Sequence, residues 1–309
     1  MTNGHVEVPP GITSLGKDEL AKILSDLGMS AASVTSIAGP DVTEIKSATA
    51  PGKYPYGNQT FNGFSSLVSV SFPALTIIGD WAFMAGDNLD MPCPLTDLDC
   101  PAATSIGMGA FAYCSSLTSI HCPAATRIAD IAFYSCTSLE SVDLPAVTSI
   151  EGEPTQGANS TFGRCSRLKY INIPAVEIIP KWTFRGCPLT AFDFLAVVSI
   201  GEGAFEGCTS LTSAKMPVVA YIGAGAFNKC TSLTSVEVPA KAFIGVRAFA
   251  GCPSLENPPM AANGERCRVA CKECRTRAAW ASAAVVCFPI WFPFIAYKTR
   301  CFTRKWFPG

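Results

Sequence analysis

One sequence block recurs through most of this chain at a nearly constant spacing. The block reads Ile-Gly-x-x-Ala-Phe-x-x-Cys-x-x-Leu, and its anchoring phenylalanines are Phe61, Phe83, Phe111, Phe133, Phe162, Phe184, Phe205, Phe227 and Phe249. Five of the eight gaps between them are 22 residues, one is 21, and two are stretched to 28 and 29. A fixed period in the 20s indicates a solenoid, in which one repeat forms one coil and no coil is stable alone. The period therefore predicts a stack of about nine coils, whose long regular surface suits binding better than catalysis.

Each repeat contains two local patterns. Phe205, Cys208 and Leu211 are spaced by three, which predicts a short helical turn that carries all three on one side. Apolar and polar residues then alternate over 211–217, and alternation indicates a strand. In the equivalent stretch of an earlier coil, alternation predicts that Ile120 points inward and His121 points outward.

Proline and glycine divide each repeat into segments. Proline follows the strand pattern and ends it, because proline has no N–H to donate to the ladder. A second short extended segment comes next, such as 147–150. The glycines that follow this segment are predicted to form a tight corner, and they are Gly107, Gly201, Gly223 and Gly245.

This repeat resembles the BspA-type leucine-rich repeat, whose consensus is the same Ile-Gly-x-x-Ala-Phe-x-x-Cys-x-x-Leu block. The resemblance covers roughly residues 58–256. It implies an α/β-type repeat solenoid, a leucine-rich repeat right-handed coil with short strands and short helical turns. It also implies a microbial cell-surface or secreted protein that binds host proteins or other cells. The family brings no residue-level site.

The cysteines follow the repeat rather than a disulfide framework. The chain has 15 cysteines, and seven of them occupy one slot, three residues after the phenylalanine: Cys114, Cys136, Cys165, Cys187, Cys208, Cys230 and Cys252. Equivalent residues of adjacent coils lie about 4.7–4.9 Å apart, which exceeds the usual Cβ separation of a disulfide, about 3.5–4.5 Å. The sequence therefore predicts reduced, buried thiols that act as small hydrophobes.

The N-terminal residues 1–57 are predicted to form a cap with one short helix. Residues 18–28 read as an amphipathic helix with Leu20, Ile23, Leu24 and Leu27 on one face, and Gly28 ends it. An exposed end coil needs such a polar cover. The first ten residues contain neither a charged region nor an apolar run, so no conventional signal peptide is expected.

The C-terminal residues 257–309 form a basic, Cys-rich tail. From Glu265 onward nine Lys or Arg and two Glu give a net charge of +7, which leaves −8 for the first 264 residues because the whole chain carries −1. Residues 278–297 are 20 uncharged, mostly apolar residues, enough to span about 30 Å of hydrocarbon as a helix. Pro289 and Pro293 interrupt that helix. The segment is therefore interpreted as a membrane anchor, as a segment packed on the last coil, or as a disordered or out-of-frame tail.

The sequence offers no catalytic, cofactor or metal site. Only two histidines occur, His5 and His121, and no Ser/His/Asp set is indicated. The Gly-x-Gly corners are not followed by Gly-Lys-Ser/Thr or a long helix, so they do not indicate a phosphate cradle. Zinc sites usually combine two close ligand pairs, whereas Cys267, Cys271 and Cys274 have no histidine nearby. The acidic repeat region argues against nucleic acid as a partner.

The remaining candidate is a protein-binding face on the outward column of the strands. Its members are Asp97, Asp99, Ser119, His121, Ser141, Asp143, Tyr170, Asn172, Asp193, Ser213, Lys215, Ser235 and Glu237. Tyr170 stands out, because an exposed aromatic residue among serines favours contact with a partner. The alternatives are a solvated face without a ligand, and binding by the insertions at 88–94 and 151–160. Two functions stay open: a cell-surface adhesion module that binds a protein ligand, and an intracellular interaction scaffold with reduced cysteines.

Overall fold

The computed structural model describes residues 4–47, 59–84, 93–152, 160–256 and 258–259. The chain divides into two compact units, Met1–Cys271 and Lys272–Gly309. The second unit lies wholly outside the described residues, and every element given below belongs to the first.

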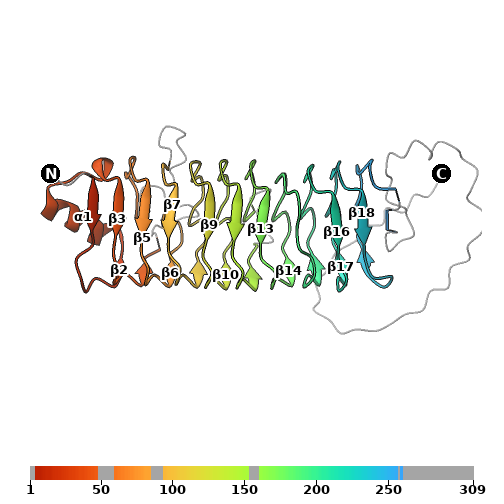
Figure 1. Ribbon diagram of the computed structural model, residues 1–309, viewed down its shortest axis with the longest axis horizontal. Helices are drawn as coiled ribbons and strands as arrows, with labels where there is room; N and C mark the ends of the chain where they lie inside the picture. The colour runs from red at the N-terminus through yellow and green to blue at the C-terminus, as the bar shows by residue number, and fades with distance from the viewer. Residues whose placement is uncertain (1–3, 48–58, 85–92, 153–159, 257, 260–309) are drawn as a thin grey trace, which may run out of the picture. The chain divides into compact units, whose positions relative to one another are not determined.

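Two rows of parallel strands run through the stacked coils (Figure 1). The first row consists of three-residue strands, here called the long strands. They are β1 His5–Glu7, β3 Ser36–Ala38, β5 Ser69–Ser71, β7 Asp97–Asp99, β9 Ser119–His121, β11 Ser141–Asp143, β13 Tyr170–Asn172, β16 Ser213–Lys215 and β18 Ser235–Glu237. Each long strand buries its middle residue wholly or in part and turns its two outer residues outward, as alternation predicts.

The second row consists of two-residue strands, here called the short strands. They are β2 Ser14–Leu15, β4 Glu44–Ile45, β6 Ile77–Ile78, β8 Ser105–Ile106, β10 Arg127–Ile128, β12 Ser149–Ile150, β14 Ile178–Ile179, β15 Ser199–Ile200, β17 Tyr221–Ile222 and β19 Phe243–Ile244. The second residue of each is buried, and the first faces outward.

Both rows are interrupted, but at different coils. The long strands form three sheets, β1-β3-β5-β7, β9-β11-β13 and β16-β18. The short strands form two sheets, β2-β4-β6-β8-β10-β12 and β14-β15-β17-β19. Where β12 and β14 are not hydrogen-bonded, β11 and β13 still pair; where the long strands break, the short strands continue.

The core consists of columns of like side chains, as the repeat predicts. The phenyl rings of adjacent coils stack with centroids about one coil apart, for example 5.2 Å between Phe205 and Phe227 with an interplanar angle of 4°. A third backbone ladder runs beside this column, because the N–H of Phe205 donates to the carbonyl of Ala226 at 2.7 Å and the same bond recurs between other coils. The phenylalanine column is therefore fixed by its backbone as well as by packing.

The predicted short helical turns are hydrogen-bonded turns rather than α-helices. The N–H of Cys208 donates to the carbonyl of Phe205 at 3.1 Å, and the N–H of Leu211 donates to that of Cys208 at 3.3 Å. These i→i+3 bonds do not continue into a helix, because a residue of left-handed backbone lies between phenylalanine and cysteine. That residue is Gly207 in this coil, with φ of 74°.

The corner glycines are required by close packing between coils. A Cβ on Gly201 would lie 2.5 Å from the backbone nitrogen of Lys181, and one on Gly223 would lie 2.6 Å from that of Glu202. Both glycines keep ordinary negative φ. The corner is thus a place where one coil touches the backbone of the preceding coil, rather than a turn that needs left-handed glycine.

Left-handed backbone occurs instead two residues before seven of the nine anchoring phenylalanines. Trp81 and Trp182 occupy this slot with φ of 60° and 56°, and Gly109 and Gly203 follow them in the next coil with φ of 58° and 59°. A Cβ on Gly109 would lie 2.2 Å from the Trp81 ring, and one on Gly203 would lie 2.4 Å from the Trp182 ring. Each indole therefore lies against the glycine of the following coil.

The stack begins earlier than the repeat predicts. Residues 1–57 were expected to form a cap outside the coils, yet β1 pairs with β3, β3 with β5, β2 with β4, and β4 with β6. Val6 and Ile37 fill the inward slots of two additional coils. The repeat pattern misses these coils because they carry α1, Lys17–Leu27, and the 3₁₀ turn η1, Ala31–Ser33, in place of the Phe-x-x-Cys block.

The helix α1 buries three of its four predicted apolar residues. Leu20, Ile23 and Leu24 are buried, whereas Leu27 is 49% exposed and does not belong to the core. The Glu19 carboxylate accepts the N–H of Gly16 at 3.1 Å, and Gly28 ends the helix in left-handed conformation.

No helix within the described ranges has the length and apolar character that a membrane crossing requires. The predicted anchor at 278–297 and Cys267, Cys271 and Cys274 lie outside the described residues.

Candidate functional site

The outward column of long strands brings most of the predicted site residues into two rows. Cross-strand partners place Ser119, Ser141 and Tyr170 side by side, with Ser213 opposite Ser235 further along. The second row holds His121, Asp143 and Asn172, and then Lys215 opposite Glu237; Asp97 and Asp99 lie on β7. All of these side chains are exposed or half-buried. This surface is called the long-strand face below.

The charged groups of the long-strand face are bonded to one another between coils. His121 Nδ1 lies 2.7 Å from one oxygen of Asp143, and the amide of Asn172 donates to the other oxygen at 2.7 Å. The Ser71 hydroxyl donates to Asp99 at 2.8 Å. Lys215 and Glu237 form an exposed ion pair at 3.3 Å, which contributes little stability. Much of the face is therefore internally neutralised.

Tyr170 is the exposed large hydrophobic side chain of this face. It is 54% exposed, and its ring makes no stacking contact with any described residue. It lies at the end of the β9-β11-β13 sheet, beside the carboxylate, amide and imidazole of the second row. An aromatic ring with a hydroxyl tip, surrounded by hydrogen-bonding groups, can contact a protein partner through both apolar and polar atoms.

Asp193 does not belong to a strand, contrary to the prediction. Its coil is one residue shorter, with Cys187-Pro-Leu189 in place of the usual Cys-x-x-Leu. Phe192 takes the inward slot of the missing strand and packs on Phe205 with ring centroids 5.1 Å apart. The Asp193 carboxylate accepts the N–H of Leu195 at 2.9 Å, so it closes its own turn. The next coil carries the small Ala214 in the slot where Phe192 lies.

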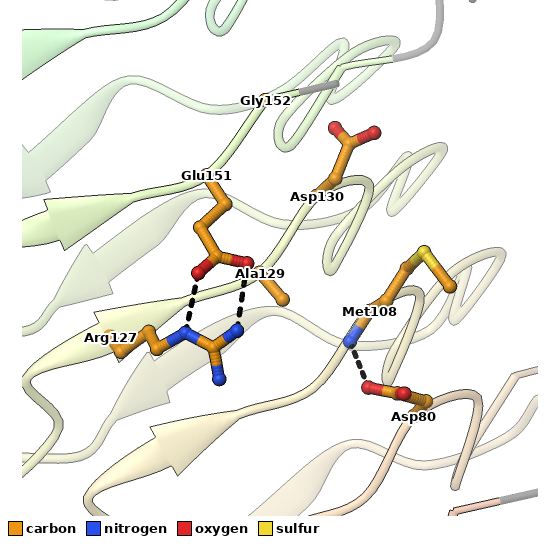
Figure 2. Close-up of a pocket in the computed structure, with 7 residues that line it drawn as sticks. All are labelled: Asp80, Met108, Arg127, Ala129, Asp130, Glu151 and Gly152. Carbon is orange, nitrogen blue, oxygen red and sulfur yellow. Dashed lines mark hydrogen bonds and ion pairs between the residues drawn. The ribbon is translucent and has the colours of Figure 1, made fainter.

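A surface hollow of about 400 Å³ lies beside the short strands (Figure 2). It is lined by Asp80, Met108, Arg127, Ala129, Asp130, Glu151 and Gly152. Arg127 meets Glu151 through two hydrogen bonds of 2.6 and 2.9 Å, and this contact raises the pKa of the guanidinium. The Asp80 carboxylate accepts the N–H of Met108 at 2.7 Å. The Arg127, Glu151 and Asp80 side chains of the hollow thus link neighbouring coils. The described residues include no group of three or more His, Cys, Asp or Glu arranged to bind a metal ion.

The two insertions predicted as alternative binding sites, 88–94 and 151–160, lie mostly outside the described residues. Residues 85–92 and 153–159 lie outside the described ranges. Of the flanking residues, Cys93 occupies the cysteine slot of its stretched coil, directly before Pro-Leu95. The prediction from the sequence missed this member of the column, because the insertion separates it from Phe83.

The cysteine column is buried, as predicted, and it also makes hydrogen bonds. All ten described cysteines are free. The Cys208 thiol donates to the carbonyl of Phe184 in the preceding coil at 3.2 Å, and the Cys230 thiol donates to that of Phe205 at 3.1 Å. Equivalent bonds run along the column from Cys114 to Cys252. Burial raises the pKa of the Cys208 and Cys187 thiols, so both stay protonated at neutral pH.

A second surface, which the repeat pattern does not predict, lies on the short strands of the C-terminal coils. Six apolar residues on these strands or in the segments that flank them are between 38% and 61% exposed: Ile178, Val198, Val218, Tyr221, Phe243 and Val246. The Tyr221 and Phe243 rings stack at 5.2 Å with an interplanar angle of 3°. This surface is called the apolar face below.

The N-terminal coils of the same row are mostly polar at the equivalent positions, with Ile77 on β6 as the exception. There the residue before each short strand is threonine, and Thr104, Thr126 and Thr148 each donate a hydroxyl to the preceding coil's threonine carbonyl. From β15 onward the threonine is replaced by Val198, Ala220 and Ala242. This change from threonine to apolar residues along the row of short strands sets the apolar face apart from the rest of the row.

Comparison with known proteins agrees with the repeat. A family model described as "BspA type Leucine rich repeat region (6 copies)" matches residues 41–153 and 155–256. No curated protein sequence matches the chain.

Among solved structures, a leucine-rich repeat protein from Bacteroides ovatus is 23% identical, with a TM-score of 0.40 over 81% of this chain and 85% of that chain. A leucine rich cell surface protein from Faecalibacterium prausnitzii is 22% identical, with a TM-score of 0.36 over 82% and 74%. The leucine-rich repeat protein of T. pallidum is 23% identical, with a TM-score of 0.41 over 72% and 78%. Since the family model covers about 70% of the sequence, the chain belongs to the BspA-type leucine-rich repeat family.

Proposed function

We propose that this protein is a non-catalytic protein-binding module, and that it acts in adhesion at a cell surface. Leucine-rich repeat proteins generally act as scaffolds that bind other proteins. One observation carries the assignment of the binding face: Tyr170 is exposed on a rigid sheet, next to polar groups whose geometry is fixed by bonds between coils. A preorganised face of this kind loses little conformational entropy on binding.

Adhesion is tested with beads that carry the full-length chain and with epithelial monolayers, before and after the monolayer is stripped with trypsin. A protein ligand on the cells predicts attachment that trypsin abolishes. Exchange of Tyr170→Ala together with Asn172→Ala should remove most of the attachment while the circular dichroism stays unchanged.

The matched control is Ser213→Ala with Lys215→Ala, which changes the same two slots of β16, in a separate sheet. Attachment that survives the Tyr170 and Asn172 exchange would place the binding surface elsewhere. Equal loss in both double variants, with unchanged circular dichroism, would extend the binding surface along the long-strand face as far as β16.

A second function is favoured by the free thiols. Ten described cysteines are free, and disulfides are rare in reducing compartments. This observation supports an intracellular interaction scaffold. Protease added to intact cells separates the two functions: cleavage of the repeats supports surface adhesion, and protection until lysis supports the scaffold.

A further inference from the structure

The apolar face plays no part in the packing of its own coil stack. It extends over β14, β15, β17 and β19, where Ile178, Tyr221 and Phe243 turn outward and are each at least 45% exposed. Contiguous apolar surface of several hundred Å² is rare on soluble monomers and usually marks a contact surface. The inward residues of the same strands already complete the core, so the outward residues add nothing to it.

The side chains of this face are arranged in a self-complementary order. Along the sheet the outward residues are Ile178, Ser199, Tyr221 and Phe243, in cross-strand register. A two-fold axis that runs parallel to the strands, between β15 and β17, would bring two copies face to face with their strand order reversed. Each Tyr221 ring would then lie opposite the small Ser199 of the other copy, and each Ile178 opposite the other Phe243.

The charges at the two borders of the face fit the same symmetry. Glu177 lies beside β14 at one border, and Lys241 lies two residues before Phe243 at the other. Both are exposed, and neither forms an ion pair with any other described residue. Reversal of the strand order brings Glu177 of one copy to Lys241 of the other, twice per pair. An isologous contact requires this kind of reciprocity.

We propose that two copies of this chain associate through the apolar face, around a two-fold axis parallel to the short strands. The contact places Tyr221 and Ser199 beside its axis, Ile178 and Phe243 further out, and opposite charges at its rim. A largely apolar centre with a charged rim is the usual anatomy of a protein interface. It goes beyond the proposed adhesion function, because it uses the short strands and leaves the long-strand face out of the contact.

The experiment is sedimentation equilibrium of the full-length chain over a concentration series. We expect a species of about 65 kDa, twice the monomer mass of 32.6 kDa. Tyr221→Glu should raise the dimer dissociation constant by about 100-fold or more, because a charge would be buried opposite Ser199. Ile77→Glu is the matched control, because Ile77 occupies the same slot on β6 and is 45% exposed, but lies outside the apolar face.

Charge reversal tests the two-fold arrangement itself. Glu177→Lys and Lys241→Glu should each raise the dissociation constant by about 5–10-fold, and the doubly exchanged chain should recover to within about threefold of the original. Both residues are exposed, so the variants are expected to keep their circular dichroism.

A purified chain that sediments as a monomer would overturn the proposal, and would mean that the face is covered by another part of the chain or by a different protein. A dimer insensitive to Tyr221→Glu, or a double charge exchange without recovery, would equally overturn it. Loss of bead attachment in the Tyr170 and Asn172 variant leaves these measurements unaffected, so the two proposals fail separately.

Discussion

Exchange of Gly203 for alanine tests the contact between an indole ring and the glycine of the next coil. Gly203 has φ of 59°, and a Cβ there would lie 2.4 Å from Trp182 Cδ1 and 2.7 Å from Nε1. Left-handed backbone costs an L-residue about 1–2 kcal/mol. Displacement of a packed ring costs about 1–3 kcal/mol more. We therefore expect Gly203→Ala to lower the free energy of unfolding by about 2–5 kcal/mol.

Gly225→Ala is the matched control for backbone strain. Gly225 occupies the same slot with φ of 61°, and the nearest atom to its Cβ would be Asn228 Cβ at 3.8 Å, an ordinary contact. It has no indole against it, because the preceding coil carries Gly203 in the tryptophan slot. The expected loss is about 1–2 kcal/mol, from the backbone alone.

The assay is urea unfolding of the full-length variants, followed by circular dichroism, with a double-mutant cycle. In a Trp182→Ala background the ring is absent, so Gly203→Ala should cost no more than Gly225→Ala. Equal losses for Gly203→Ala and Gly225→Ala in the original background would refute the reasoning, because they would show that the indole does not rest on the glycine.

Three further predictions concern the core columns. Phe205→Ala should cost about 3–5 kcal/mol of unfolding free energy in urea titration, because Phe205 is fully buried in the stack; a loss below about 1 kcal/mol would contradict its interior position. Cys208 should resist a thiol reagent in the native protein and react in denaturant, as read by mass spectrometry, because burial raises its pKa; modification in the native protein would contradict this. Burial also raises the pKa of Cys122 from 9.0 to about 12, so its contribution to stability is complete below pH 9 and is lost between pH 9 and 12. Between pH 9 and 12 the free energy of unfolding should therefore fall less steeply in Cys122→Ala than in the original chain, by about 1.4 kcal/mol per pH unit. Equal slopes in the two chains would contradict the raised pKa of Cys122.

The coil core was predictable because its columns are chemically repetitive. In seven coils the residue three positions after the anchoring phenylalanine is cysteine, so the burial of that cysteine follows from its position in the repeat. The two N-terminal coils were not predictable in this way. Their inward residues Val6 and Ile37 carry no Phe-x-x-Cys signature, and a helix replaces the turn. These coils are identified by the backbone pairing of strands that are only two or three residues long. Strands this short do not give a hydrophobic alternation long enough to recognise in the sequence.

For the candidate site, the sequence predicts which side chains point outward but not which of them contact one another. Alternation correctly turned His121 and Asp143 outward, yet the bond of 2.7 Å between them depends on cross-strand register. Asp193 was misplaced because the deletion of one residue before Leu189 removes the strand. The apolar face was missed because Ile178 and Ile179 are chemically identical in the sequence, although one is 61% exposed and the other fully buried.

The staggered interruptions of the two strand rows bear on how the stack unfolds. A repeat array behaves as a chain of units coupled only to their nearest neighbours, and a junction without coupling would let the two sides melt separately. Here the long-strand break between β7 and β9 is bridged by β8 and β10, and the one between β13 and β16 by β14, β15 and β17. The short-strand break between β12 and β14 is bridged by β11 and β13. Every junction therefore retains at least one ladder, so the coils are coupled from end to end and denaturant should reveal one cooperative transition rather than a sequence of independent ones.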